Sequence, residues 1–270
     1  MDADTDTLRR ICAGVGFDVE RAEGSLLERV ALLAERSESV ADSVRMVRYA
    51  EAVFRLYDAE APSKSFSPLE RRTVVLACLF SDVGKTGPDE ADPDGRRLVA
   101  EMFAVEGVRD DRITVSEFLR AYFPGDADER VARFERLGLD PAMSIRQFWN
   151  LHSGWTLAIS ERAGLPREAV AAAATHHLLE GVNPDAIVGE DGRFTRDFGD
   201  NVAFDRAEKL VIVLDKYDAV RRRSGRDHAA TIAWLRERLA TNPRFRGDAE
   251  LAALIDDVDR ALGPTGLDAG

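Results

Sequence analysis

The chain of 270 residues is long enough to bury the core of one large domain or of two small ones. Its composition, with 45% apolar and 32% charged residues, is that of an ordinary globular protein, and no apolar stretch approaches the length that spans a bilayer. The formal net charge of −12 argues against non-specific nucleic-acid binding, which needs a basic surface, but allows small anions to be bound by local cations.

The N-terminal region predicts helices and a cytoplasmic location. The first residues, MDADTDTLRR, are acidic and lack the apolar segment of a signal peptide, and Cys12 and Cys78 make no disulfide framework. Apolar residues recur with helical spacing over residues 25–35, where Ser25 is the expected start of a capping box, and again over residues 40–57.

The stretch LACLFSDVGKT, residues 76–86, ends in the way a phosphate-binding P-loop ends. That motif needs a glycine five residues before Gly84, so that backbone N–H groups can surround the phosphates, but Leu79 stands there. Periodicity leaves strand and helix open for the apolar run before it, and the charged residues 70–72 are typical of the first turn of a helix. The sequence therefore argues against a P-loop.

Residues 87–143 differ from the rest of the chain. They are rich in Asp, Gly and Pro and contain short helical patterns near 116–122 and 127–137. We interpret this segment as an insertion of mixed structure beside a main helical bundle.

The helical pattern resumes after the insertion. A predicted capping box at Ser144 opens a helix that runs to about residue 163, and Pro166 opens a second helix that Gly181 stops. Residues 186–198 contain the sequence EDGR, which predicts the turn of a short β-hairpin. A strongly apolar helix over 203–220 and two weaker helices follow.

Polar groups fall at several positions that the pattern buries. His152 lies on an inward stripe, His176 and His177 end an alanine-rich helix, and Asp82 and Asp215 each follow an apolar run. Burying such groups together is costly without a cation, and imidazole and carboxylate side chains from separate helices suit Mn, Fe, Zn or Mg.

Each of these residues also has an ordinary explanation when it is taken alone. His152 fits a hydrogen-bonded core residue, Asp215 a cap on a neighbouring helix, and Lys85 a solvated surface lysine. His176 and His177 fit the C-terminus of a helix, where the dipole favours cations. The metal hypothesis therefore depends on the joint occurrence of these residues in this order.

Five segments in this order carry a resemblance to a known family: DSVRMVRYA at 42–50, SDVGK at 81–85, HSG at 152–154, THH at 175–177 and LDKYDA at 214–219. Together they resemble the HD superfamily of metal-dependent phosphohydrolases, and most of all its HD-GYP branch, which cleaves cyclic di-GMP. The family's patterns at these places are His-Ser-x-Arg-Val, His-Asp-Ile-Gly-Lys, a single His, a paired His and Ala-Asp-x-Tyr-Asp-Ala.

The resemblance implies an all-α fold, a helical HD bundle to which the hairpin and the insertion are added. Residues 39–226 would form the HD-like domain with the insertion at 87–143. Residues 1–38 would be N-terminal helices packed on its core, and residues 227–270 would be C-terminal helices of the same globular unit.

The chain departs from the family pattern at three places. Asp42 and Ser81 stand where the family has histidines, and the loop after His177 reads LLEGVNP, without the tyrosine of the GYP sequence. The family's ligands, carried over residue by residue, form two sets that share Asp82.

One implied ligand set is intact and the other is altered. The intact set has three imidazoles and a carboxylate and should hold Mn, Fe or Zn firmly; it consists of His152, His176, His177 and Asp82. The altered set offers only oxygen atoms, which favour Mg or Mn, so that its metal should be weakly bound or absent; it consists of Asp42, Ser81, Asp82 and Asp215.

The resemblance implies a phosphohydrolase or phosphodiesterase that acts on a nucleotide or a cyclic dinucleotide. Its expected catalytic residues are Asp82, Lys85 and Asp215, and its expected phosphate-binding residues are Lys85, Arg45 and Arg222. The sequence leaves open a second function, a catalytically degenerate HD domain that senses a nucleotide or binds a signalling protein. A third, an oxygenase with a mixed di-iron site, is disfavoured by the loss of two histidines.

Overall fold

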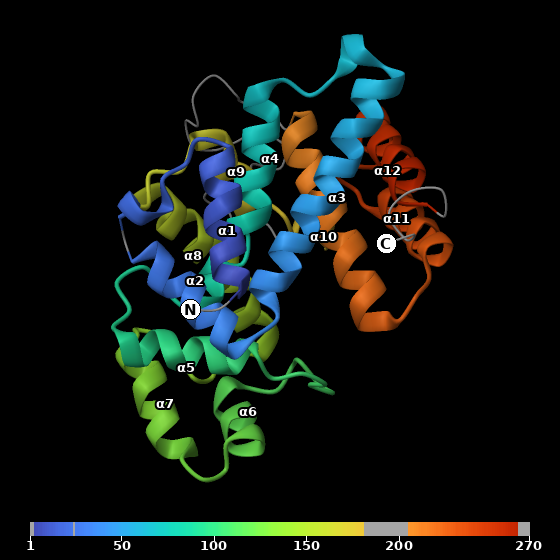
Figure 1. The fold of residues 1–270 in the computed structure, drawn as a ribbon. Coiled ribbons are helices and arrows are strands. Elements are labelled where there is room, and N and C mark those ends of the chain that lie inside the picture. The colour runs from blue at the N-terminus through green and yellow to red at the C-terminus, as the bar shows by residue number, and fades with distance from the viewer. Residues whose placement is uncertain (1–2, 24, 181–204, 264–270) are drawn as a thin grey trace.

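The computed structural model describes residues 3–23, 25–180 and 205–263, which fold entirely as helices, turns and loops without a strand (Figure 1). The α-helices are α1 (Ala3–Gly14), α2 (Leu26–Arg36), α3 (Ser39–Glu60), α4 (Pro68–Phe80), α5 (Pro93–Phe103), α6 (Val115–Tyr122), α7 (Ala127–Arg136), α8 (Ile145–Arg162), α9 (Arg167–Ala174), α10 (Arg206–Ser224), α11 (His228–Thr241) and α12 (Ala249–Leu262). Four short 3-10 turns join them: η1 (Val19–Arg21), η2 (Pro62–Lys64), η3 (Val83–Thr86) and η4 (Leu178–Glu180).

The centre of the molecule is a bundle in which α4 packs against α3, α9 and α10. Every residue from Thr73 to Phe80 of α4 is buried, as is every residue from Ala169 to Ala174 of α9. A helix that is apolar on all sides belongs in the interior. The small alanine side chains of α9 let it approach its neighbours closely, and this core carries the candidate site.

Local signals explain where several helices begin. Ser67 and Glu70 form a capping box at the start of α4, and the predicted capping box at Ser144 opens α8. The predicted capping box at Ser25 is wrong. Ser25 has a left-handed backbone (φ 60°) and makes no side-chain cap, because an N-cap needs an extended backbone.

The segment predicted as an insertion contains three helices. Its predicted pieces at 116–122 and 127–137 correspond to α6 and α7, but α5, which Asp92 caps and Pro93 opens, was not predicted. Helices α5 to α7 and the start of α8 surround a second apolar cluster, separate from the main core. In Figure 1 α6 and α7 lie at the far end of the molecule from α12.

The loop before α6 and the loop before α8 lie side by side. Thr114 and Ser144 form an isolated antiparallel bridge, flanked by hydrogen bonds from Val115 N to Met143 O (2.9 Å) and from Ile145 N to Ile113 O (2.9 Å). Two helix–loop–helix units, α5–α6 and α7–α8, are therefore joined through their loops. Because α8 continues into the main bundle, it connects this pair to the candidate site.

The two ends of the described chain pack on the bundle. Helices α1 and α2 contribute Leu8, Cys12 and Leu26 to the main apolar core, and α12 packs against α3 and α10. The hairpin predicted at 186–198 lies outside the described residues. Within residues 3–23, 25–180 and 205–263, no helix is both long and apolar enough to cross a membrane.

Candidate metal centre

The turn that follows α4 is pressed against α8. The hydroxyl of Thr156 donates to the Ser81 carbonyl (2.9 Å) and accepts from the Gly84 N–H (3.0 Å). A Cβ atom at Gly84 would lie 2.0 Å from the His152 carbonyl oxygen, so only glycine allows this approach. The contact places Asp82 beside His152. A helix, not a strand, leads into this turn, which decides between the two structures that periodicity left open.

Two histidines face each other through their Nε2 atoms. Nδ1 of His152 contacts the Trp149 carbonyl, and Nδ1 of His176 lies 2.6 Å from the Ala173 carbonyl. Because a carbonyl can only accept, both Nδ1 atoms carry the proton, and both Nε2 atoms present lone pairs. These lone pairs are only 3.3 Å apart. A cation placed between two such acceptors would be stabilised by both lone pairs.

A carboxylate and a third imidazole complete the cluster. Asp82 Oδ1 lies 4.0 Å from Nε2 of His152 and 3.8 Å from Nε2 of His176. One ring nitrogen from each of His152, His176 and His177 lies within 4.8 Å of the others. The prediction that these three imidazoles converge is confirmed. His176 and His177 follow α9 in a turn instead of ending the helix, which stops at Ala174.

The donor set fits a divalent metal ion. Metal–nitrogen bonds of about 2.0–2.1 Å in a tetrahedral site place ligand atoms about 3.3 Å apart, which matches the separation of the two Nε2 atoms. Asp215 Oδ2 is also buried without a well-directed hydrogen bond, although Lys216 lies close to it. Imidazole-rich sites of this kind suit Zn, Fe or Mn.

Burial keeps the imidazoles neutral. It lowers the pKa of His152 to about 3 and also lowers the pKa values of His176 and His177. Neutral imidazole is the form that binds a metal. For Asp82 and Asp215 burial opposes ionisation, but the charges of Lys85 and Lys216 outweigh it, lowering both pKa values, that of Asp215 to about 2.

Two lysines hold the carboxylates of the cluster. Lys85 Nζ donates to Asp82 Oδ2 (2.6 Å), and Lys216 Nζ lies 2.8 Å from Asp215 Oδ2. Lys85 is therefore turned into the cluster and is not a solvated surface lysine. Lys216, which the sequence analysis missed, occupies the variable position of the family's Ala-Asp-x-Tyr-Asp-Ala pattern, so the resemblance contains no signal for it.

An ion-pair network lies at the mouth of the cluster. Arg45 donates to Asp42 (2.5 Å) and to Asp218 (2.5 Å), and Arg222 donates to the other oxygen of Asp42 (2.5 Å). Burial raises the pKa of Asp42. The space between this network and Asp82 is small, about 20 Å³. The structure thus brings the two predicted phosphate-binding arginines together but pairs both with carboxylates.

Asp42 and Ser81, which stand where the resembled family has histidines, have their own hydrogen-bond partners. Asp42 is bound by two arginines, and the Ser81 hydroxyl donates to the Cys78 carbonyl of its own helix (3.4 Å). Asp42 lines the same small cavity as Asp82, His177 and Asp215. Its role as a metal ligand remains a prediction.

Arg29 is a further residue that the sequence analysis missed. Its side chain is fully buried and donates to Thr86 Oγ1 (2.8 Å) and to the carbonyls of Pro88 (3.0 Å) and Asp89 (2.7 Å). Burial and the nearby Arg96 lower its pKa to about 10. Arg29 therefore anchors the loop directly after Lys85, and an arginine in an amphipathic helix gives no sequence signal of this role.

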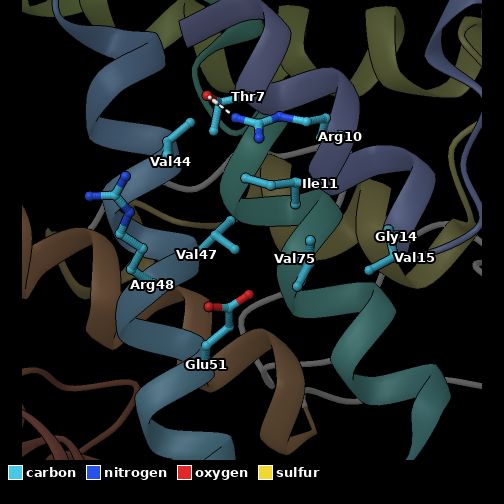
Figure 2. A pocket seen from close by; sticks show the side chains of 10 residues that line it. All are labelled: Thr7, Arg10, Ile11, Gly14, Val15, Val44, Val47, Arg48, Glu51 and Val75. Atoms are coloured by element: carbon cyan, nitrogen blue, oxygen red, sulfur yellow. Dashed lines mark hydrogen bonds between the residues drawn. The ribbon is translucent and has the colours of Figure 1, made fainter. Parts of the chain in front are cut away.

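A larger cleft lies elsewhere, between α1, α3 and α4 (Figure 2). Its volume is about 500 Å³, its apolar side is formed by Ile11, Val47 and Val75 among others, and Arg48 and Glu51 stand at its edge. None of the predicted site residues lines it. The chemistry that the sequence predicts is therefore concentrated in the small cavity.

A scan against protein-family models, a search of curated proteins and a search of solved structures each returned no match to this chain.

Proposed function

We propose that this chain is a metal-dependent phosphohydrolase of the HD type, which cleaves a phosphate ester in a nucleotide or a cyclic dinucleotide. The observation that carries the proposal is the pair of facing Nε2 lone pairs of His152 and His176 beside the Asp82 carboxylate. Cationic side chains adjoin this pair, as an anionic substrate would require. We expect the protein to act in the cytoplasm.

The proposed metal ligands are His152, His176 and Asp82, with His177 and Asp215 next to them. A divalent ion bound there supplies Lewis-acid activation of water and of a phosphoryl oxygen. Lys85, held 2.6 Å from Asp82, would donate to a phosphoryl oxygen. Its ammonium group is already desolvated, so that little reorganisation is needed when the anion arrives.

Arg45 and Arg222 would bind the rest of the phosphate group, because a guanidinium fork matches phosphate oxygens. Both must first exchange their present partner Asp42 for the substrate. Asp42 is also better matched than Asp215 to accept a proton. Burial raises the pKa of Asp42, whereas the lysine beside Asp215 holds that carboxylate ionised with a pKa of about 2.

A second function is supported by a different observation. The carboxylate of Asp42 pairs with both arginines, the Ser81 hydroxyl bonds to a backbone carbonyl, and the cavity at the mouth holds only about 20 Å³. These features favour a degenerate HD domain that binds a nucleotide or a signalling partner without turnover. Turnover measurements distinguish the two functions.

The test is hydrolysis of bis-p-nitrophenyl phosphate, and of cyclic dinucleotides, by protein reconstituted with Mn²⁺. We expect turnover and bound metal in the native chain, and loss of both in His176→Ala, because that change removes one of the two facing lone pairs. Metal content is measured by elemental analysis of desalted protein, and folding by circular dichroism.

The control is His228→Ala, since His228 is the one histidine outside the cluster and contacts Tyr217 and Asp259 instead. It should keep its metal and its turnover. A native chain that binds metal and nucleotide but hydrolyses nothing would support the sensor. A native chain that stays metal-free after Mn²⁺, Fe²⁺ and Zn²⁺ reconstitution would refute the metal-dependent phosphohydrolase.

A further inference from the structure

Lys216 contacts two members of the candidate site. Its side chain is only 2% exposed, and its Nζ lies 2.5 Å from His177 Nδ1 and 2.8 Å from Asp215 Oδ2. A buried ammonium group is tolerated only where acceptors surround it. These two acceptors are 3.7 Å apart, so the ammonium group spans the gap between them.

The same two atoms are also donors that suit a second divalent ion, although the resemblance assigns His177 to the first ligand set. An ion bound by an imidazole nitrogen and a carboxylate oxygen lies about 2.0–2.2 Å from each. Donors that are 3.7 Å apart can meet such an ion only in the space between them, and Lys216 Nζ contacts both. The hydrogen bond from Lys216 to His177 also occupies the Nδ1 lone pair that would otherwise bind a metal ion.

Protein cations balance the carboxylates around the cluster before any metal binds. Each carboxylate contacts at least one lysine or arginine: Asp82 with Lys85, Asp215 with Lys216, and Asp42 and Asp218 with Arg45 and Arg222. The three imidazoles add no charge in this arrangement: Nδ1 of His152 and of His176 donates to a backbone carbonyl while Nε2 accepts, and Nδ1 of His177 accepts from Lys216. One divalent ion brings this group to a charge of about +2, and a second would bring it to about +4 without new carboxylates to offset it.

We infer that Lys216 is a built-in cation that takes the place of a second metal ion, so that the chain binds one divalent ion on His152, His176 and Asp82. The inference deepens the proposed metal site but does not require turnover. In this inference His177 and Asp215 bind the ammonium group of Lys216 and not a metal ion.

The test is the number of Mn²⁺ ions bound per chain, measured by equilibrium dialysis and elemental analysis at saturating metal. The native chain should bind one ion. Lys216→Met removes the ammonium group from between Asp215 and His177 and should raise the number to two. Lys216→Arg keeps the charge and should bind one.

The matched control is Lys209→Met, because Lys209 is a second buried lysine of α10 whose partners, Asp248 and Glu250, lie away from the cluster. It should bind one ion. Circular dichroism and thermal melting show whether each variant is folded, and the native chain serves as the test if Lys216→Met does not fold.

Two ions in the native chain, or one ion in a folded Lys216→Met, would overturn the inference. The phosphohydrolase proposal fails separately, if the native chain binds its single ion and hydrolyses no phosphodiester. A chain that binds no metal fails both.

Discussion

At the residue scale, the site depends on polar groups whose partners are far away in the chain. Arg29 reaches the loop after Lys85 across more than fifty residues, and Thr156 links Ser81 to Gly84. These contacts determine where Asp82 and Lys85 lie, although neither Arg29 nor Thr156 belongs to the predicted ligand set. Positioning residues of this kind have no periodicity or motif by which sequence analysis could find them.

Gly84 gives the sharpest prediction at this scale. In Gly84→Ala the new methyl group would lie 2.0 Å from the backbone carbonyl oxygen of His152, which cannot rotate aside, so the turn must move away from α8. We expect a loss of about 3 kcal/mol in the free energy of unfolding. Metal affinity should fall about tenfold or more, because Asp82 moves with the turn. Urea unfolding and metal titration measure the two effects.

Gly154→Ala is the control for this substitution. Gly154 lies inside α8, and a Cβ there meets no atom within 4 Å. Replacing a helical glycine by alanine should stabilise the protein by about 0.5–1 kcal/mol and leave metal affinity unchanged. Equal destabilisation by the two substitutions would contradict the close approach of the turn to α8.

At the element scale, the helices were predicted best where local signals agree. Apolar spacing and a capping residue predicted α8 within a residue of its start, and the predicted pieces of the insertion match α6 and α7. The predicted helix over 40–57 corresponds to α3. Helix α5 was missed because its Asp92-Pro93 start lies in a segment whose Asp, Gly and Pro content indicates loops.

The two predicted capping boxes differ in the structure, and this difference can be tested. Ser144 accepts from the Gln147 N–H (3.2 Å), whereas Ser25 makes no side-chain cap. We expect Ser144→Ala to cost about 1 kcal/mol in the free energy of unfolding and Ser25→Ala to cost almost nothing. Denaturant unfolding of both variants checks this; a loss of similar size in each would mean that Ser25 caps α2 after all.

At the scale of the whole molecule, the chain is acidic, yet its candidate site is lined with lysines and arginines. Distant parts of the chain supply them: Arg45 comes from α3, Lys85 from η3, and Lys216 and Arg222 from α10. The net negative charge and these cations are compatible because each cation of the site is paired locally with a carboxylate. A net charge therefore does not predict where the cations of a protein gather.

Global stability should depend on pH through Glu208, which is fully buried in α10. Burial and the neighbouring Asp205 raise the pKa of Glu208 to about 9. The folded state therefore keeps a proton that the unfolded state releases near pH 4.5. The contribution of Glu208 to the free energy of unfolding is complete below that pH and is lost as the pH rises towards 9. The free energy of unfolding should fall by at most about 1.4 kcal/mol per pH unit, as expected for the titration of one group.

Glu208→Gln removes this titration while it keeps the shape of the side chain. We expect the variant to be more stable than the native chain at pH 8 and to lose the decline between pH 5 and pH 9. Glu237→Gln, at an exposed position of α11, is the control and should leave the pH profile unchanged. The test is thermal melting of all three proteins across this pH range. Parallel curves of melting temperature against pH for the native chain and Glu208→Gln would refute the prediction.

The sequence by itself determined much of the helix pattern, because apolar spacing and capping depend on residues close in the chain. The all-α class was implied by the resemblance to the HD superfamily, and the described residues show it. It also indicated that His152, His176 and His177 belong together, and the structure confirms that they meet. Only the tertiary structure decided that Asp42 pairs with Arg45 and Arg222, and that a lysine reaches His177. These contacts join residues that are far apart in the chain, and the free energy of burying charge, which no local pattern records, selects among them.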